Sequence, residues 1–86
     1  MGFLSRLLGP GHRPRDLLAD LAEDYVREVE QAALLRDHAE KARYPQAASQ
    51  LRRLADVETR HGEWLRDRLI ALGGHVPVVE PPTVGG

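Results

Sequence analysis

The sequence of 86 residues contains no cysteine. Disulfide bonds, thiolate zinc sites, iron–sulfur clusters and thiol catalysis are therefore excluded. A metal ion would have to be held by histidine, glutamate and aspartate, which form the harder set of protein ligands. Aromatic residues are also scarce, at 5% of the chain. A hydrophobic core must therefore be built mainly from aliphatic side chains.

Long basic and long apolar segments are missing as well. The net charge is -1, and no basic stripe is present that would indicate a nucleic-acid partner. The opening MGFLSRLLG is apolar, but it is too short to cross a bilayer and lacks the features of a signal peptide. We therefore expect no membrane span and a cytoplasmic location, either free or inside a cytoplasmic assembly.

What the chain does contain is an ordinary globular composition, with 42% hydrophobic and 29% charged residues. Breaks rich in proline and glycine at residues 9–14 (GPGHRP) and 43–45 (RYP) interrupt its helical pattern, and residues 72–74 (LGG) supply a glycine C-cap. We predict three parts: a short N-terminal segment 1–14, a helical domain 15–74, and a flexible Pro/Gly-rich tail 75–86.

The helical domain is predicted to be an antiparallel two-helix hairpin. Its helices should cover about residues 15–42 and 45–72, and Pro45 suits the first turn of the second helix. A connection this short forces neighbouring helices to run antiparallel. No strand pattern is present, so the predicted fold class is all-α. A domain this small would also gain stability from self-association.

Both predicted helices carry a glutamate in the middle of an apolar stripe. Each helical residue advances about 100°, which places Glu28 and Glu58 at the centres of the two stripes and His61 about 60° to one side of Glu58. The predicted seam of the second helix comprises positions 51, 54, 58, 61, 65, 68 and 72. The apolar members are Leu17, Leu18, Leu21, Tyr25, Ala32, Leu35 and Ala39 in the first stripe, and Leu51, Leu54, Ala55, Leu65, Leu69 and Leu72 in the second.

These polar residues should lie at one level of the hairpin. Counted from Tyr44 in the turn, Glu28 lies sixteen residues before it, Glu58 fourteen after and His61 seventeen after. A carboxylate at i and an imidazole at i+3 share one helix face, so both can reach a single ion. Because buried carboxylates are costly unless they are paired or bind a metal, we interpret Glu28, Glu58 and His61 as metal ligands.

One hairpin supplies only half of such a site. Two hairpins related by a twofold axis would form a four-helix bundle with two copies of each ligand at its centre. A Glu from each of two helices and a Glu-x-x-His from each of the other two is the ligand set of carboxylate-bridged di-iron bundles. We therefore predict that a homodimer is the minimal functional unit and that its subunits share two iron ions.

The segment ETRHGEWLRDRLIALGGHVP, residues 58–77, resembles the second-helix segment of bacterioferritins and rubrerythrins in the ferritin-like superfamily. In size and spacing, residues 16–77 are most similar to encapsulated ferritins, two-helix proteins whose dimers assemble into rings inside encapsulin shells. The resemblance implies a ferroxidase with Glu28, Glu58 and His61 as ligands, which oxidises Fe(II) with dioxygen or peroxide. It also implies a place inside an encapsulin nanocompartment as cargo for iron storage.

The sequence departs from that family in two places. Leu35 stands where the family has a tyrosine beyond its first ligand glutamate, so the role of that tyrosine is lost unless Tyr25 takes it over. The tail ends PPTVGG, which is similar to the peptides that dock such cargo to the shell but lacks the Ser-Leu that usually follows. The absence of cysteine excludes the rubredoxin module of full-length rubrerythrins.

Other interpretations of the three ligands remain open. The protein could be a rubrerythrin-like peroxide reductase, which would differ in its oxidant. It could also be a metal-free helical interaction protein whose buried acids fix the pairing of helices. Histidine and carboxylate ligands suit manganese and zinc as well as iron.

The remaining polar residues receive simpler interpretations. His12, His38 and His75 are not expected to be ligands, and His38 should be exposed to solvent. Asp24, one turn before Glu28, is interpreted as a surface acid rather than as support for a ligand.

A second stripe of apolar residues predicts a homo-oligomer larger than a dimer, with Trp64 as an anchor of the further interface. Its members are Ala19, Ala22, Val26, Val29, Ala33, Val57, Trp64 and Ala71. The N-terminal segment should pack against a neighbouring subunit.

Overall fold

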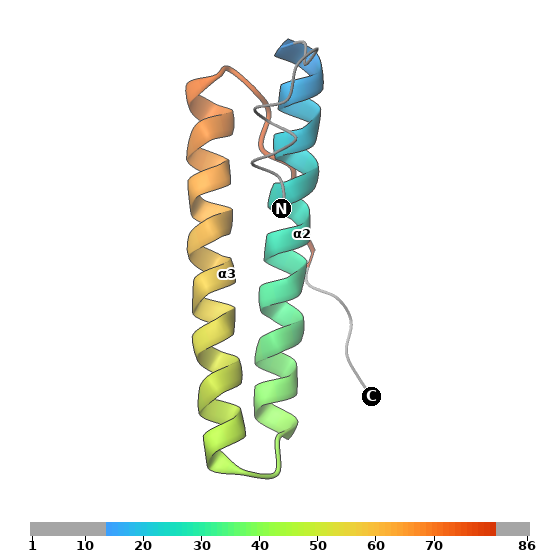
Figure 1. Cartoon of the computed structure of the whole chain (residues 1–86). Helices are drawn as coiled ribbons and strands as arrows, with labels where there is room; N and C mark the ends of the chain where they lie inside the picture. The colour runs from blue at the N-terminus through green and yellow to red at the C-terminus, as the bar shows by residue number, and fades with distance from the viewer. Residues whose placement is uncertain (1–13, 81–86) are drawn as a thin grey trace.

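Two long helices lie side by side and run antiparallel (Figure 1). The computed structural model describes residues 14–80, in which helix α2 spans Pro14–Lys41 and helix α3 spans Pro45–Ala71. Residues 74–80 form an irregular tail, and the described range contains no strand. The predicted all-helical hairpin is therefore confirmed. The segment 1–13, with His12, and the PPTVGG ending lie outside the described residues.

The start of α3 follows from the proline in the turn. Tyr44 has an extended backbone at the N-cap, and Pro45 occupies the first helical turn, where its missing N–H is not needed. The backbone N–H of Ala48 then donates to the Tyr44 carbonyl at 3.0 Å. The chain thus reverses direction within a few residues, and the two helices must pack against each other.

The other end of α3 closes with the predicted glycine cap. Gly73 has a φ of 78°, a left-handed conformation that glycine adopts without steric cost. Its N–H donates to the Ile70 carbonyl at 3.0 Å, and the N–H of Gly74 donates to the Leu69 carbonyl at 2.7 Å. This pair of bonds is a Schellman motif, which satisfies carbonyls left free at the helix end.

The interface between the helices is built differently in its two halves. In the terminal half, near the chain ends, Leu21, Leu65 and Leu69 form a buried leucine core. In the turn half, the buried apolar residues are all alanines, which form an alanine seam: Ala32, Ala39, Ala48 and Ala55. Gly62, also buried, lies between these halves on α3. The two helices therefore meet through small side chains near the turn and through large ones near the termini.

The predicted seam of α3 is wrong in its orientation. The residues that α3 buries are Ala48, Ala55, Gly62, Leu65 and Leu69, a line whose centre lies about 40° from Glu58, on the side away from His61. Leu54 and Leu72, which were expected inside, are 52% and 44% exposed. Small residues let helix backbones approach closely, so α3 turns its alanine and glycine face toward α2 and leaves these leucines outside.

The irregular tail returns along α2. Val76 packs against the leucine core together with Leu17, Leu18, Ala22 and Tyr25. In Figure 1 the tail passes behind α2 as it leaves the end of α3. The start of the tail thus adds an apolar residue to the terminal half only.

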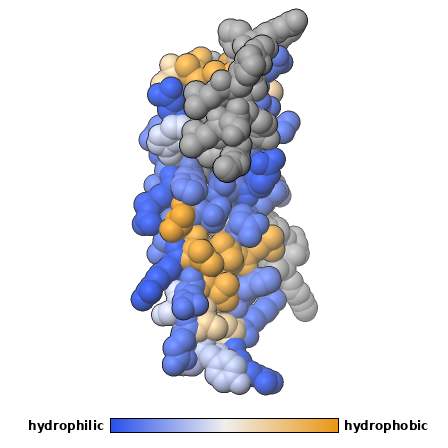
Figure 2. All heavy atoms as spheres, viewed as in Figure 1, coloured by the Kyte–Doolittle hydropathy of each residue, from blue (hydrophilic) through white to orange (hydrophobic). Residues whose placement is uncertain are grey.

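The face toward the viewer in Figure 2 carries a compact hydrophobic patch over both helices, in the turn half. By helical spacing, Leu34 and Leu35 of α2 and Leu54 and Val57 of α3 fall on one side of the pair. We call these four residues the leucine flank. Leu34 is 37% exposed and Leu54 is 52% exposed. Neither described helix is both long and apolar enough to cross a membrane.

Candidate metal centre

Glu28 of α2 and Glu58 and His61 of α3 meet at the middle of the hairpin. One ligand atom from each of them lies within 4.8 Å of the others. The structure therefore brings together the three residues that the sequence pattern singled out. The short turn and the two uninterrupted helices place them at one level, and the i, i+3 spacing puts Glu58 and His61 on one face of α3.

The cluster is buried on one side and open on the other. The Glu28 side chain is 19% exposed, whereas that of His61 is 56% exposed. His61 Nδ1 lies 3.7 Å from Glu28 Oε2, and this buried oxygen accepts no hydrogen bond. The site thus contains a buried carboxylate oxygen with unused acceptor capacity beside an imidazole, which is an arrangement that a cation would stabilise.

Charge repulsion at the site is visible in the pKa of Glu28. Burial, together with hydrogen bonding to Glu58 and repulsion from its carboxylate, raises the pKa of Glu28 to about 7. Asp24 adds to this increase, and the nearby Arg27 opposes it. Without a cation, a proton therefore resides on Glu28 in mildly acidic solution. A divalent metal ion would replace that proton and relieve the repulsion.

Asp24 is buried, with 3% of its side chain exposed, so its interpretation as a surface acid is wrong. Its Oδ1 accepts a hydrogen bond from Arg27 Nη1 at 2.6 Å, and it precedes Glu28 by one helical turn. Arg27, three residues later in the same helix, could have indicated that Asp24 is buried, because an arginine at i+3 can neutralise a buried acid. Asp24 and Arg27 therefore belong to the electrostatic surroundings of Glu28.

The other histidines lie apart from the cluster. His38 is exposed near the end of α2, as expected, and His75 is exposed in the irregular tail. Leu35 stands where the resemblance predicts a tyrosine. Both Leu35 and Tyr25, the residue that could take over its role, are half-buried. Trp64 is 46% exposed, with the Arg68 guanidinium 5.9 Å from its ring centroid.

The donor set fits a divalent transition metal, since two carboxylates and one imidazole suit iron, manganese or zinc. Three side chains from one hairpin leave coordination positions to be filled by water or by other groups. The ligand that is most exposed, His61, lies on the side of the hairpin that carries the leucine flank. The arrangement can therefore bind a metal while leaving an open side next to an exposed apolar surface.

Comparisons with family models, with curated proteins and with solved structures give no significant match to this chain.

Proposed function

We propose that two copies of this chain combine their Glu28, Glu58 and His61 side chains into a di-iron centre that oxidises ferrous ions. The observation that carries this proposal is the convergence of these three ligands within 4.8 Å on a partly buried, carboxylate-rich site. Two copies provide four carboxylates and two imidazoles, the ligand set of di-iron helical bundles. The likeness of residues 58–77 to ferritin-like segments supports the same assignment.

Each side chain has a distinct role in the proposed centre. Glu58 from each chain would help to hold the iron ions at the interface between the two copies. Glu28 and His61 would complete the coordination of each iron. Burial of Glu28 keeps this carboxylate oriented, and its raised pKa means that iron binding releases a proton near neutral pH.

The proposed reaction is a two-electron reduction of dioxygen. Each of two ferrous ions gives up one electron and becomes ferric, and dioxygen takes both electrons and two protons to leave as hydrogen peroxide. Holding the two ferrous ions close together allows both electrons to reach one oxidant. If peroxide is instead the preferred oxidant, it takes two electrons and two protons and gives two water molecules. Rates measured with the two oxidants separate ferroxidase from peroxide reductase.

The leucine flank supports pairing of two hairpins across this site. Leu34 and Leu54 expose large apolar surfaces beside the open side of the cluster, and covering them would be favourable. A partner seated there would also exclude water from His61 and supply the second set of ligands. Larger oligomers, encapsulin docking and iron storage remain predictions from the sequence.

The activity test compares iron-dependent oxygen consumption of the native protein with that of Glu28→Ala, Glu58→Ala and His61→Ala. Each variant should lose the activity, because each removes two of the six ligands from the dimer. The matched control is His38→Ala, which removes an exposed histidine far from the cluster and should keep full activity. Retention of activity in all three ligand variants would contradict the proposal. Iron content below about one ion per two chains, against the two expected, would favour a metal-free interaction protein.

A further inference from the structure

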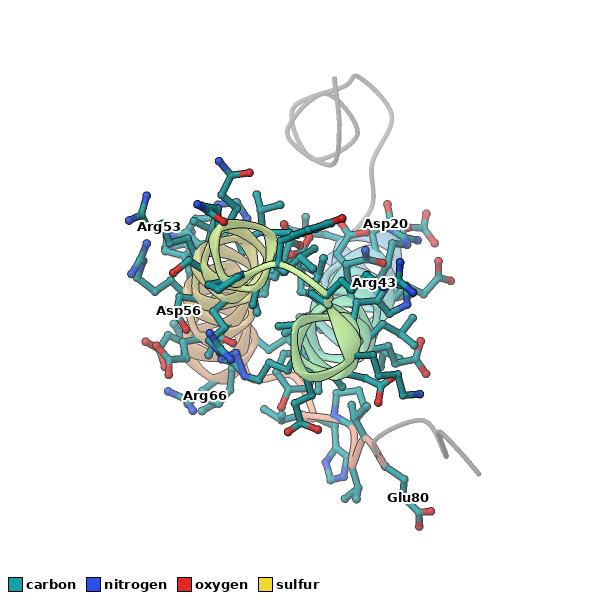
Figure 3. The ribbon with its side chains drawn as sticks, turned by 90° about the horizontal axis from the view of Figure 1, so that it is seen from below. Asp20, Arg43, Arg53, Asp56, Arg66 and Glu80 are labelled. Carbon is teal, nitrogen blue, oxygen red and sulfur yellow. The ribbon has the colours of Figure 1, made fainter. Side chains whose placement is uncertain are left out.

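A groove of about 360 Å³ runs between the helices on the side opposite the leucine flank. Its apolar wall is formed by Tyr25, Val29, Ala32, Ala33 and Gly62. Figure 3 shows Arg66, which lines this groove, on the same side of the helix pair as the tail residue Glu80. The groove therefore lies behind the candidate metal centre, on the face that a partner seated on the leucine flank would leave open.

Gly62 lines this groove and lies next to Glu28. A Cβ atom at Gly62 would lie 3.7 Å from Val29 Cγ2 and 3.8 Å from Glu28 Cβ, which are ordinary contact distances. Packing between the helices therefore does not require a glycine here, although glycine within a helix is less stable than alanine. Because Gly62 has no side chain, a methyl-sized space is left beside it. This space connects the groove to Cβ of Glu28, one of the proposed ligands.

We infer that this groove, with Gly62 at its floor, is the route by which dioxygen reaches the di-iron centre. The inference rests on the proposed function, in which the partner hairpin covers the other side of the site. Dioxygen is small, uncharged and weakly hydrated, so an apolar groove would concentrate it relative to water. The space beside Gly62 then leads it toward Glu28 and Glu58.

The charged rim of the groove argues against another helix as its occupant. Arg36, Glu63 and Arg66 surround the apolar wall. Arg36 donates to Thr59 Oγ1 at 2.9 Å and to Asp56 Oδ1 at 3.4 Å, which ties the rim across the two helices. A helix packed over this rim would have to desolvate several charges, and that is costly unless every charge is paired. A small uncharged molecule can enter without disturbing them.

The first test measures where dioxygen collects in the metal-free full-length protein. Dissolved dioxygen is paramagnetic and increases the relaxation of nearby methyl protons in NMR spectra. The methyl groups of Val29 and Ala33 should be relaxed more strongly than those of Val78, which is 94% exposed and reports on bulk solvent. Gly62→Val should reduce the effect at Val29 and leave Val78 unchanged. Equal relaxation of Val29 and Val78 in the native protein would overturn the inference.

The second test measures the oxygen dependence of iron oxidation. Gly62→Ala and Gly62→Val should raise the KM for dioxygen severalfold, more for valine, while the maximal rate at saturating dioxygen and anaerobic Fe(II) binding stay the same. Ser49→Thr adds a methyl group at an exposed position of α3 and should leave the KM unchanged. Because alanine favours the helix, Gly62→Ala should unfold at a higher urea concentration than the native protein, so a raised KM cannot reflect unfolding.

The outcomes separate this inference from the proposed function. If iron is not oxidised but the groove methyl groups show excess relaxation, the di-iron proposal fails and with it the role of the groove as a route to iron, although the groove still collects dioxygen. If iron is oxidised with the same KM in both Gly62 variants, dioxygen takes another route and the inference is wrong. If Gly62→Val changes the mass of the assembly without changing the KM, the groove is a subunit interface, which also overturns it.

Discussion

The turn half and the terminal half of the hairpin use the same residue types in opposite ways. Near the termini, Leu21, Leu65 and Leu69 are buried between the helices, and Val76 of the tail packs over them. Near the turn, alanines are buried and the large side chains of Leu34 and Leu54 point outward. One half is thus stabilised within a single chain, whereas the other leaves large apolar side chains exposed.

The candidate metal centre lies at the boundary between these halves. Toward the termini, Glu28 adjoins the buried Asp24 and the leucine core. Toward the turn, its open side continues into the leucine flank. If two hairpins pair through the leucine flank as proposed, the terminal half supplies the stability of the single chain and the turn half supplies the contact between chains. Substitutions in the terminal half should therefore change the free energy of unfolding of the single chain, whereas substitutions in the turn half should change the dimer dissociation constant.

The largest expected effect is on assembly, from Leu54→Asp in the leucine flank. The substitution removes the further burial of a half-exposed leucine in each chain, about 1 kcal/mol per leucine, and places a carboxylate in an apolar contact. The dimer dissociation constant should therefore rise about a hundredfold or more, measured by analytical ultracentrifugation. Ile70→Asp is the matched control, because Ile70 is 59% exposed but lies away from this flank. If both variants dimerise like the native protein, the leucine flank is not the interface.

The next effect is on the stability of the metal-free chain, from Leu69→Ala in the leucine core. Leu69 is 1% exposed, so its truncation should lower the free energy of unfolding by about 2–5 kcal/mol. Leu54→Ala should lower it by less than about 1 kcal/mol under dilute conditions, because Leu54 is already half exposed in one chain. Urea unfolding of both variants checks the contrast. Equal losses would show that the two halves are not built differently.

A smaller effect should follow from Gly74→Ala at the start of the tail. A Cβ atom there would lie 2.9 Å from Leu18 Cδ2, 3.1 Å from Leu69 Cδ2 and 3.3 Å from the Leu69 carbonyl oxygen. The first contact is too short and the other two are tight, so the Leu18 and Leu69 side chains or the tail must shift, at a cost of about 1 kcal/mol. Thermal unfolding measures this loss, and Gly62→Ala, which has room for its methyl group, should show a gain instead. A gain at both glycines would contradict the packing described for the tail.

The last expected effect is the pH dependence of stability at the boundary. The pKa of Glu28 rises from 4.5 to about 7 on folding, so the folded chain holds its proton more tightly than the unfolded chain. The metal-free protein should therefore lose stability as pH rises from about 4.5 to about 7. Urea unfolding at pH 5 and pH 8 should show a larger loss for the native protein than for Glu28→Gln. An equal loss in both would mean that Glu28 is not the responsible group.

Much of this architecture could be predicted because it depends on local chemistry. Pro45 and the pair Gly73 and Gly74 determine where α3 begins and ends, and counting from the turn places Glu28 level with His61. The orientation of α3 could not be predicted in the same way. A helical stripe weighted by hydrophobicity centres on leucines such as Leu54, whereas close packing favours alanine and glycine at the contact.

The buried environment of Asp24 also escaped the sequence pattern. A single acid beside an apolar stripe is usually solvated, and the contact with Arg27 helps to explain how Asp24 is accommodated between the helices. The packing of Val76 was equally invisible, because a Pro- and Gly-rich tail has no periodicity from which a contact can be inferred. The burial of Asp24 and the packing of Val76 both depend on how the helices and the tail pack in three dimensions, which the sequence pattern does not reveal.

The central claim, that two hairpins share a pair of iron ions, is tested most directly by native mass spectrometry of the full chain after anaerobic addition of Fe(II). The native protein should form a dimer that carries two iron ions, and the Glu58→Ala protein should carry none. Iron bound to single chains, or iron bound equally by the Glu58→Ala variant, would contradict it.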